Sequence, residues 1–359
     1  MEEDLTRNSR SLDPKQWRTL TNAQRINMVE HLLLNHERFN VLLTRIDYCA
    51  RFGNEIESKN PPCLAILANT GAGKTTLIDT WLAKAPLHEM ETLEGTVIPY
   101  LYVSVLSSPK KKGAVAAFLR ALHDPNPSRG TEWDMISRVH RLIKACKVQV
   151  IFVDEFQHLI DKDTKTVVHA VTDFLKDIIT QTHRPMILTG MLGEAEAILE
   201  ANEQLDRRIG TPLILSPFEW DRQHSETIKE FRTLMRDIDR GLPLDLSNLQ
   251  DEELAFRFFY ASDGYLGWVM EIVREAAIKA IDRECNMLNM ALLAEAYDAR
   301  LGGTDVGVGK MNPFSTPKFT QATADQFKSA LKKRKHKGTK PDTSSNGNQS
   351  GNKPKKPKE

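Results

Sequence analysis

The segment 61–87 constrains the fold of this chain more than any other stretch. Two prolines precede a short apolar run, residues 63–67, and a helical pattern of apolar residues starts at Lys74. Between them lies the loop Gly71-Ala72-Gly73-Lys74-Thr75. A strand, a glycine-rich turn and a helix in direct succession predict a phosphate-binding loop, because the helix amino end and free backbone amides attract anions.

The loop follows the P-loop pattern, Gly, four residues, then Gly-Lys-Ser/Thr, with Ala68 in the place of the first glycine. The pattern predicts binding of ATP and Mg²⁺. Lys74 is expected to reach the β and γ phosphates and the Thr75 hydroxyl to ligate Mg²⁺. The nucleotide contacts are expected from residues of the loop and of the first helical turn: Asn69, Thr70, Gly71, Ala72, Gly73, Lys74, Thr75 and Thr76.

Apolar runs that read as buried strands recur along the chain, with helical patterns between them. The five runs are residues 63–67, 100–105, 148–153, 186–189 and 212–215. Strands that alternate with helices predict an α/β fold in which a five-stranded parallel sheet is covered on both faces.

Two adjacent carboxylates, Asp154 and Glu155, end the third of these runs. At the carboxyl end of a strand beside the P-loop strand, Asp154 would orient Mg²⁺ and Glu155 would polarise the attacking water. Thr189, at the end of the next run, would hold that water. These three residues predict hydrolysis in addition to binding.

An arginine pair, Arg207 and Arg208, precedes the last strand. An arginine there can project into the nucleotide site of a neighbouring subunit and stabilise transition-state charge, and Arg208 is the favoured candidate. In that case activity requires an oligomer. An ordinary surface pair that bridges to acids is the alternative.

Composition changes mark four regions: an N-terminal helical lead-in (1–52), the α/β nucleotide-binding core (53–218), a helical lid (219–301) and a basic tail (302–359) rich in Pro, Gly, Ser, Asn and Lys. Residues 328–359 contain eleven Lys or Arg and two acidic residues, a net of +9, whereas the whole chain carries +1. The tail is expected to be largely disordered and either to meet a polyanion or only to aid solubility.

No stretch approaches the roughly 18 to 20 apolar residues that cross a bilayer, so no membrane partner is expected. The acidic start, Met1-Glu2-Glu3-Asp4, lacks the apolar segment of a secretory signal. The cysteines are scattered and predict reduced thiols rather than a disulfide or zinc framework: Cys49, Cys63, Cys146 and Cys285. A cytoplasmic protein is therefore expected.

The P-loop, the Asp-Glu strand, the polar Thr189, the arginine pair and the helical lid occur in the order found in AAA+ ATPases. The chain resembles more closely the TniB/TnsC-type AAA+ ATPases of Tn7-like transposons, including the CRISPR-associated ones. This resemblance rests on Asp154-Glu155-Phe156-Gln157-His158-Leu159, on the lead-in at 36–52, on the spacing from Thr75 to Asp154, and on the turn Gly264-Tyr265-Leu266-Gly267.

The resemblance implies an AAA+ P-loop NTPase fold with a small C-terminal α-helical lid, in a bacterial cytoplasmic protein. It also implies a regulator that assembles with ATP into rings or filaments on double-stranded DNA without reading its sequence. Such proteins link a target-selection protein of the TniQ type to the transposase, and hydrolysis permits disassembly. An initiator-like ATPase that loads another protein on DNA, or a signalling scaffold without DNA, is the alternative.

Two departures from the family pattern matter. Ala68 replaces a glycine, and nucleotide binding is expected to survive this change. The lid turn has Gly267 and Trp268 where initiator-type relatives usually carry an arginine that touches the γ-phosphate. Slow, switch-like hydrolysis is therefore expected.

Basic residues at two places are candidates for DNA contacts. Lys110, Lys111 and Lys112 follow the second strand, and Arg141 and Lys144 share a helical spacing with Arg138 and Lys147. A solvated charge run is the alternative for the lysines. The segment 312–337, with Phe314 and Phe319, is expected to dock on a partner or on DNA outside a ring.

Overall fold

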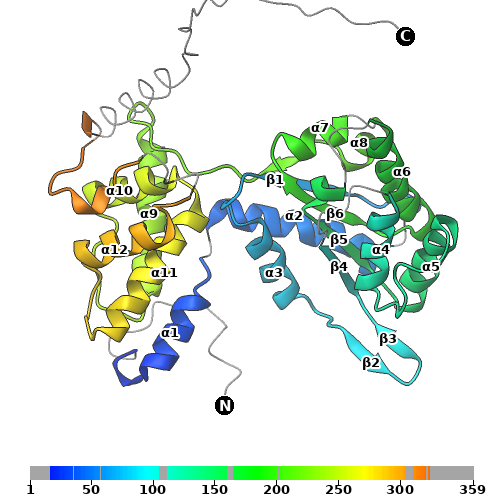
Figure 1. Cartoon of the computed structure of the whole chain (residues 1–359), viewed down its shortest axis with the longest axis horizontal. Coiled ribbons are helices and arrows are strands. Elements are labelled where there is room, and N and C mark those ends of the chain that lie inside the picture. Colours follow the sequence, from blue (N-terminus) through cyan, green and yellow to red (C-terminus); the bar gives the residue numbers. More distant parts are fainter. Residues whose placement is uncertain are drawn as a thin grey trace, which may run out of the picture.

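The computed structural model describes residues 17–34, 36–56, 58–104, 111–159, 165–200, 203–304, 307, 310–320 and 322–323. An α/β body and a helical body lie side by side, and helix α2 (Glu37–Asn54) runs from the junction between them into the α/β body (Figure 1). The division of the chain into a nucleotide-binding core and a lid, with the bounds given above, stays a prediction.

The centre of the α/β body is a five-stranded, fully parallel sheet. All five strands coincide with apolar runs of the sequence: β1 (Leu64–Ala68), β4 (Tyr100–Ser104), β5 (Val150–Asp154), β6 (Met186–Met191) and β7 (Leu213–Ile214). Every residue of β1 and β5 is buried, because helices cover both faces. The prediction of an α/β fold with a parallel sheet is confirmed.

The strand order is β4-β5-β6-β1-β7. The expectation that the Asp154 strand lies beside the P-loop strand is therefore wrong, because β6 stands between β5 and β1. Strand order depends on where each crossover helix returns the chain to the sheet, and a local sequence pattern does not encode that return.

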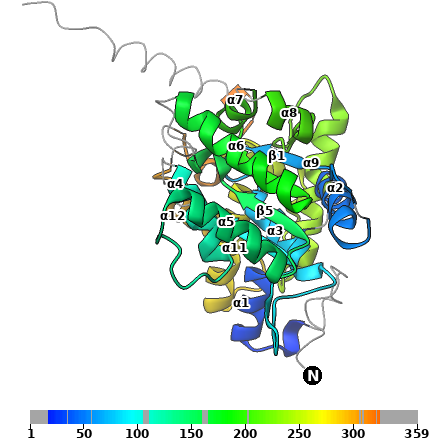
Figure 2. The ribbon, with the colours of Figure 1, turned by 90° about the vertical axis from the view of Figure 1, so that its right-hand side faces the viewer.

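Alternate side chains of each strand enter two different cores. Ala65 and Leu67 of β1 face a core closed by α4 (Lys111–Ala121), α5 (Glu132–Ala145) and α6 (Lys165–Thr182). Leu64 and Ile66 face the opposite core, closed by α2 and α3 (Lys74–Lys84). Figure 2 shows the sheet between these two helical layers.

Three elements of the core were not predicted from the sequence. An antiparallel hairpin, β2 (Met90–Thr92) and β3 (Gly95–Val97), projects between α3 and β4. The helices α7 (Glu194–Glu200) and α8 (Glu203–Ile209) follow β6. Helix α4 begins at Lys111, so Lys111 and Lys112 belong to its first turn rather than to a preceding basic turn.

The helical body consists of α9 (Ser225–Gly241), α10 (Glu252–Ser262), α11 (Leu266–Asp282) and α12 (Met290–Arg300) around one apolar core. Helix α1 (Asn22–Glu30) packs against α11 and places Val29 in the same core, whereas α2 packs on the sheet. The lead-in therefore contributes one helix to each body. None of the described helices is long and apolar enough to cross a membrane.

After α12 the chain folds back on the lid as residues 310–319, here called the strap. Phe314, within the short 3-10 helix η3 (Pro313–Ser315), and Phe319 are both buried against the lid. The buried Arg257 of α10 donates hydrogen bonds to the carbonyls of Pro313, Thr316 and Pro317. The expectation that Phe314 and Phe319 dock on a partner is wrong, because the lid core already covers both rings. The rest of that segment, from 324 on, lies outside the described residues.

Candidate nucleotide site

The predicted phosphate loop connects the carboxyl end of β1 to the amino end of α3. Gly71 has a φ of 80° and Gly73 a φ of 100°, values that strain any residue with a Cβ atom. Gly73 caps α3, so the first amides of that helix open toward the loop. The observed geometry is the anion-binding helix end that the sequence predicted.

Lys74 and Glu155 lie together although they are 81 positions apart in the chain. The Lys74 side chain is 7% exposed, and its ammonium donates a hydrogen bond of 3.0 Å to the Ala68 carbonyl and lies 3.7 Å from Oε1 of Glu155. The fold thus places one cation and one acid at the same end of the sheet, beside the phosphate loop.

Asp154 is buried and fully engaged by hydrogen-bond donors. It accepts a hydrogen bond of 2.7 Å from the Tyr102 hydroxyl, another from the Thr189 hydroxyl, and one of 2.9 Å from the Glu155 amide. These donors hold both carboxylate oxygens in place. Partial burial and then the bond to Asp154 raise the pKa of Tyr102, which therefore stays protonated as a donor.

Thr189 has a different position from the one expected. It lies within β6, fully buried, rather than at the end of the strand, and its hydroxyl donates to Asp154. Tyr102 was missed by the sequence reasoning. Its only signal was its place near the carboxyl end of an expected strand, where polar atoms gather at one sheet edge.

The oxygen donors fit a magnesium ion. Asp154 offers a carboxylate and Thr75, exposed in the first turn of α3, offers a hydroxyl. Among the described residues no group of three or more His, Cys, Asp or Glu forms a protein cage for a metal. Mg²⁺ at phosphate sites keeps several waters and takes only one or two protein ligands, so this sparse oxygen set suits it.

The lid touches the phosphate loop directly. The amide of Gly267, in the first turn of α11, donates a hydrogen bond of 2.8 Å to the Gly71 carbonyl, and the Asn69 amide donates to the Tyr265 hydroxyl at 2.7 Å. A Cβ atom at Gly267 would lie 2.4 Å from the Gly71 carbonyl oxygen. The position where the resemblance leads one to expect an arginine therefore has no room for any side chain.

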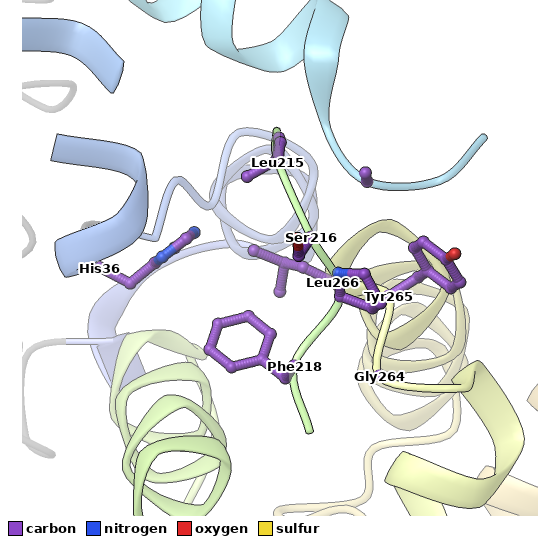
Figure 3. A pocket seen from close by; sticks show the side chains of 9 residues that line it. His36, Leu215, Ser216, Phe218, Gly264, Tyr265 and Leu266 are labelled. Carbon is purple, nitrogen blue, oxygen red and sulfur yellow. The ribbon is translucent and has the colours of Figure 1, made fainter. Parts of the chain in front are cut away.

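A small hollow of about 10 Å³ lies between the loop, the lid and the segment after β7 (Figure 3). Its lining residues are His36, Ala72, Leu215, Ser216, Pro217, Phe218, Gly264, Tyr265 and Leu266. The rings of His36 and Phe218 meet edge to face at 5.5 Å. Burial, and then the Arg38 charge, lower the pKa of His36 to about 4, so the ring is neutral at pH 7.

The arginine pair lies away from this chain's own phosphate loop. Arg208 donates a hydrogen bond of 3.2 Å to Thr180, in the last turn of α6, which leads into the amino end of β6. Lys74 follows the carboxyl end of β1. Arg208 and Lys74 therefore lie at opposite ends of the parallel strands. Arg207 is highly exposed and lies 3.6 Å from Glu203. A role in a neighbouring subunit's site remains a prediction.

The candidate DNA residues do not join the phosphate site. Lys110 lies outside the described residues, Lys111 forms an ion pair of 3.0 Å with Glu132, and Lys112 is exposed. On α5, Arg141 and Lys144 are exposed. Their helical neighbours are engaged within the fold: Arg138 pairs with Asp124, and Lys147 pairs with Glu94.

Comparison with known proteins places the site in a family context. The profile of the family described as Bacterial TniB protein matches residues 25–220. This segment holds the phosphate loop, both acids, Thr189 and the arginine pair. No functionally curated protein matches the chain.

Solved structures with a similar fold include Cdc6p and ORC proteins. Cdc6p of Pyrobaculum aerophilum is 12% identical, with 87% of this chain and 89% of that chain covered and a TM-score of 0.54. The Aeropyrum pernix ORC1 protein, solved in complex with DNA, is 15% identical, with 74% and 66% covered and a TM-score of 0.52. The ORC2 protein of the same organism, solved as ADPNP-ADP complexes, is 15% identical, with 76% and 69% covered and a TM-score of 0.50. At these identities the similarity shows the fold alone.

Proposed function

The chain belongs to the TniB family of bacterial proteins, and we propose that it hydrolyses ATP to control a transposition complex on double-stranded DNA. Its fold is that of the AAA+ P-loop ATPases. The observation that carries the proposal is the convergence of Lys74, Asp154 and Glu155 beside one phosphate loop.

Each of these side chains has a distinct chemical task in this proposal. Lys74 neutralises phosphate charge, and Glu155 accepts a proton from the attacking water. Asp154 and Thr75 would hold Mg²⁺, which supplies charge stabilisation to the transferred phosphoryl group when bound. The donors Tyr102 and Thr189 keep the Asp154 carboxylate oriented.

Slow turnover follows from the lid. The first turn of α11 presents Gly267 and Trp268 to the phosphate loop, and neither can place a positive charge on a phosphate. Transition-state charge is therefore stabilised by Lys74 and by a residue from outside this chain's own site. Hydrolysis at such a site acts as a timer for leaving DNA rather than as a motor step.

Oligomerisation supplies the missing cation. Arg208 lies at the opposite end of the parallel strands from Lys74, and we therefore assign it to the site of another copy rather than to its own. Arginines supplied from a neighbour raise phosphoryl-transfer rates by about 10³- to 10⁵-fold. We therefore propose rings or helical filaments around duplex DNA, held by phosphate contacts from basic residues such as Lys111, Lys112, Arg141 and Lys144. The partners are a transposase and a TniQ-type target-selection protein, in the bacterial cytoplasm.

Electron microscopy with nucleotide and duplex DNA tests this proposal. The variant Glu155→Gln should bind ATP without hydrolysing it and should accumulate DNA-bound rings or filaments. Replacing Lys111 and Lys112 by glutamate should abolish DNA-dependent assembly and leave nucleotide binding intact. Absence of any DNA association by the wild-type chain at low salt would refute the DNA role, and hydrolysis by Glu155→Gln would refute the assignment of the base.

A further inference from the structure

Gln157 is buried next to the proposed catalytic acid and uses both ends of its amide. It lies in the short 3-10 helix η2 (Phe156–Leu159) after β5 and is 2% exposed. Its Nε2 donates a hydrogen bond to Oε2 of Glu155, and its Oε1 accepts a hydrogen bond of 3.1 Å from the Met191 amide. One side chain thus bridges Glu155 to strand β6.

The chemistry of the bridge fixes the direction of the amide. The Met191 N–H is a donor and must face an acceptor, so Oε1 points to β6 and the NH₂ group points to Glu155. Glutamine meets both demands, since a glutamate would repel Glu155 and an asparagine is one methylene too short to span both partners. Gly190 leaves the necessary space, because a Cβ atom there would lie 2.8 Å from Gln157 Oε1.

Glu155 requires such support, because its backbone is in a strained conformation. Its φ is 53°, in the left-handed region, which is strained for a residue with a side chain. With Oε2 bound to Gln157, Oε1 is the oxygen that faces Lys74, at 3.7 Å. The nearby His158 is half-exposed, and its ring lies 4.0 Å from Oε2.

We propose that Gln157 is a positioning residue for hydrolysis, which holds the Glu155 carboxylate so that Oε1 is directed at the phosphate loop. This inference rests on the proposed function. The same strand also holds the other acid, since Thr189 of β6 donates to Asp154. Both acids are therefore tied to β6, the metal ligand through Thr189 and the base through Gln157.

Steady-state hydrolysis by the full-length chain, with DNA present, tests the inference. Gln157→Met keeps the side-chain volume and removes both hydrogen bonds, and we expect kcat to fall about 10- to 100-fold. The KM for ATP and the affinity for a fluorescent ATP analogue should change by less than about threefold, because Gln157 is assigned no contact with nucleotide. Gln157→Glu, which keeps an acceptor for Met191 but places like charge against Glu155, should lower kcat at least as much.

The control is Thr172→Val, which removes a buried hydroxyl that donates to the His169 carbonyl within α6, and it should leave kcat unchanged. A kcat within about twofold of wild type in both Gln157 variants would overturn the inference. An equal fall of kcat in Thr172→Val would also overturn it, since it would reveal a general effect of lost stability. Two further outcomes separate the proposals. A wild-type chain that does not hydrolyse ATP on DNA would refute the proposed function, and hydrolysis by Glu155→Gln would refute the assignment of the base. An inactive Glu155→Gln variant beside active Gln157 variants would refute only the positioning role.

Discussion

Replacing Arg257 by methionine should release the strap from the lid. The guanidinium is 3% exposed and donates to the carbonyls of Thr316 at 2.7 Å and Pro317 at 3.2 Å, to that of Pro313, and to Glu253. Hydrogen bonds from a charged donor contribute about 1.5–3 kcal/mol each, and methionine replaces none of them. The carbonyls can regain partners only by turning to water, so the strap must detach.

The apolar surface that the strap buries limits how much the free energy of unfolding can fall in this variant. Detachment exposes Phe314 and Phe319, and each buried phenylalanine side chain contributes about 1.5–3 kcal/mol. We therefore expect Arg257→Met to lower the free energy of unfolding by about 3–5 kcal/mol, the range for breaking a buried charged network. The change should be visible in guanidinium unfolding monitored by circular dichroism.

Limited proteolysis locates the effect. Chymotrypsin should cleave the variant after Phe314 and Phe319 much faster than the wild-type chain, because a docked strap hides both bonds. Arg236→Met on α9 is the matched control, since it removes a half-exposed arginine that pairs with its neighbour Asp237. Equal cleavage rates in Arg257→Met and wild type, or a loss of stability no larger than in Arg236→Met, would refute the reasoning.

Three further predictions follow from the site. Thr189→Val removes, at constant volume, a hydrogen-bond donor to Asp154, the carboxylate proposed to bind Mg²⁺, and should lower kcat about 10- to 100-fold. ATP hydrolysis measured across a Mg²⁺ titration checks this, and an unchanged rate would argue against orientation of Asp154 by Thr189. Gly267→Ala should displace the lid from the phosphate loop and weaken nucleotide binding up to about tenfold. The control Gly303→Ala, with nothing within 4 Å of the added Cβ, should leave binding unchanged. Titration with a fluorescent nucleotide measures the affinity of both variants. His36 has a folded-state pKa of about 4, below its unfolded value, so its contribution to stability is present above pH 6.5 and is lost as pH falls toward 4, by at most about 3 kcal/mol. Unfolding curves of His36→Phe should lack this part of the acid sensitivity, and an identical pH dependence would contradict the assignment.

Local patterns predicted most of the α/β body. Each strand is a short apolar run between helical patterns, and burial on both faces of a parallel sheet produces that signal directly. The conformation of the phosphate loop was also predicted from the sequence, since Gly71 and Gly73 have the positive φ values that the motif requires. The hairpin β2–β3 was missed because its strands have three residues each and are mostly exposed, so they carry no burial pattern.

Phe314 shows that the burial of an isolated apolar residue cannot be predicted from its neighbours in the sequence. Its surroundings in the sequence are polar and rich in proline, which favoured an exposed docking segment. The ring is instead buried by α10 and α12, and the carbonyls around it are held by Arg257. A charged residue that serves as an internal donor has the same appearance in a sequence as one at the surface.

By itself the sequence predicted a phosphate loop and two acids at a strand end, because the residues of each motif are neighbours in the chain. Tertiary structure alone decided that β6 separates β5 from β1, that Tyr102 and Thr189 hold Asp154, and that Gln157 joins Glu155 to β6. Those contacts join strands far apart in the chain. They depend on strand order and on burial. Both are set only when the crossover helices have placed the strands side by side in one sheet.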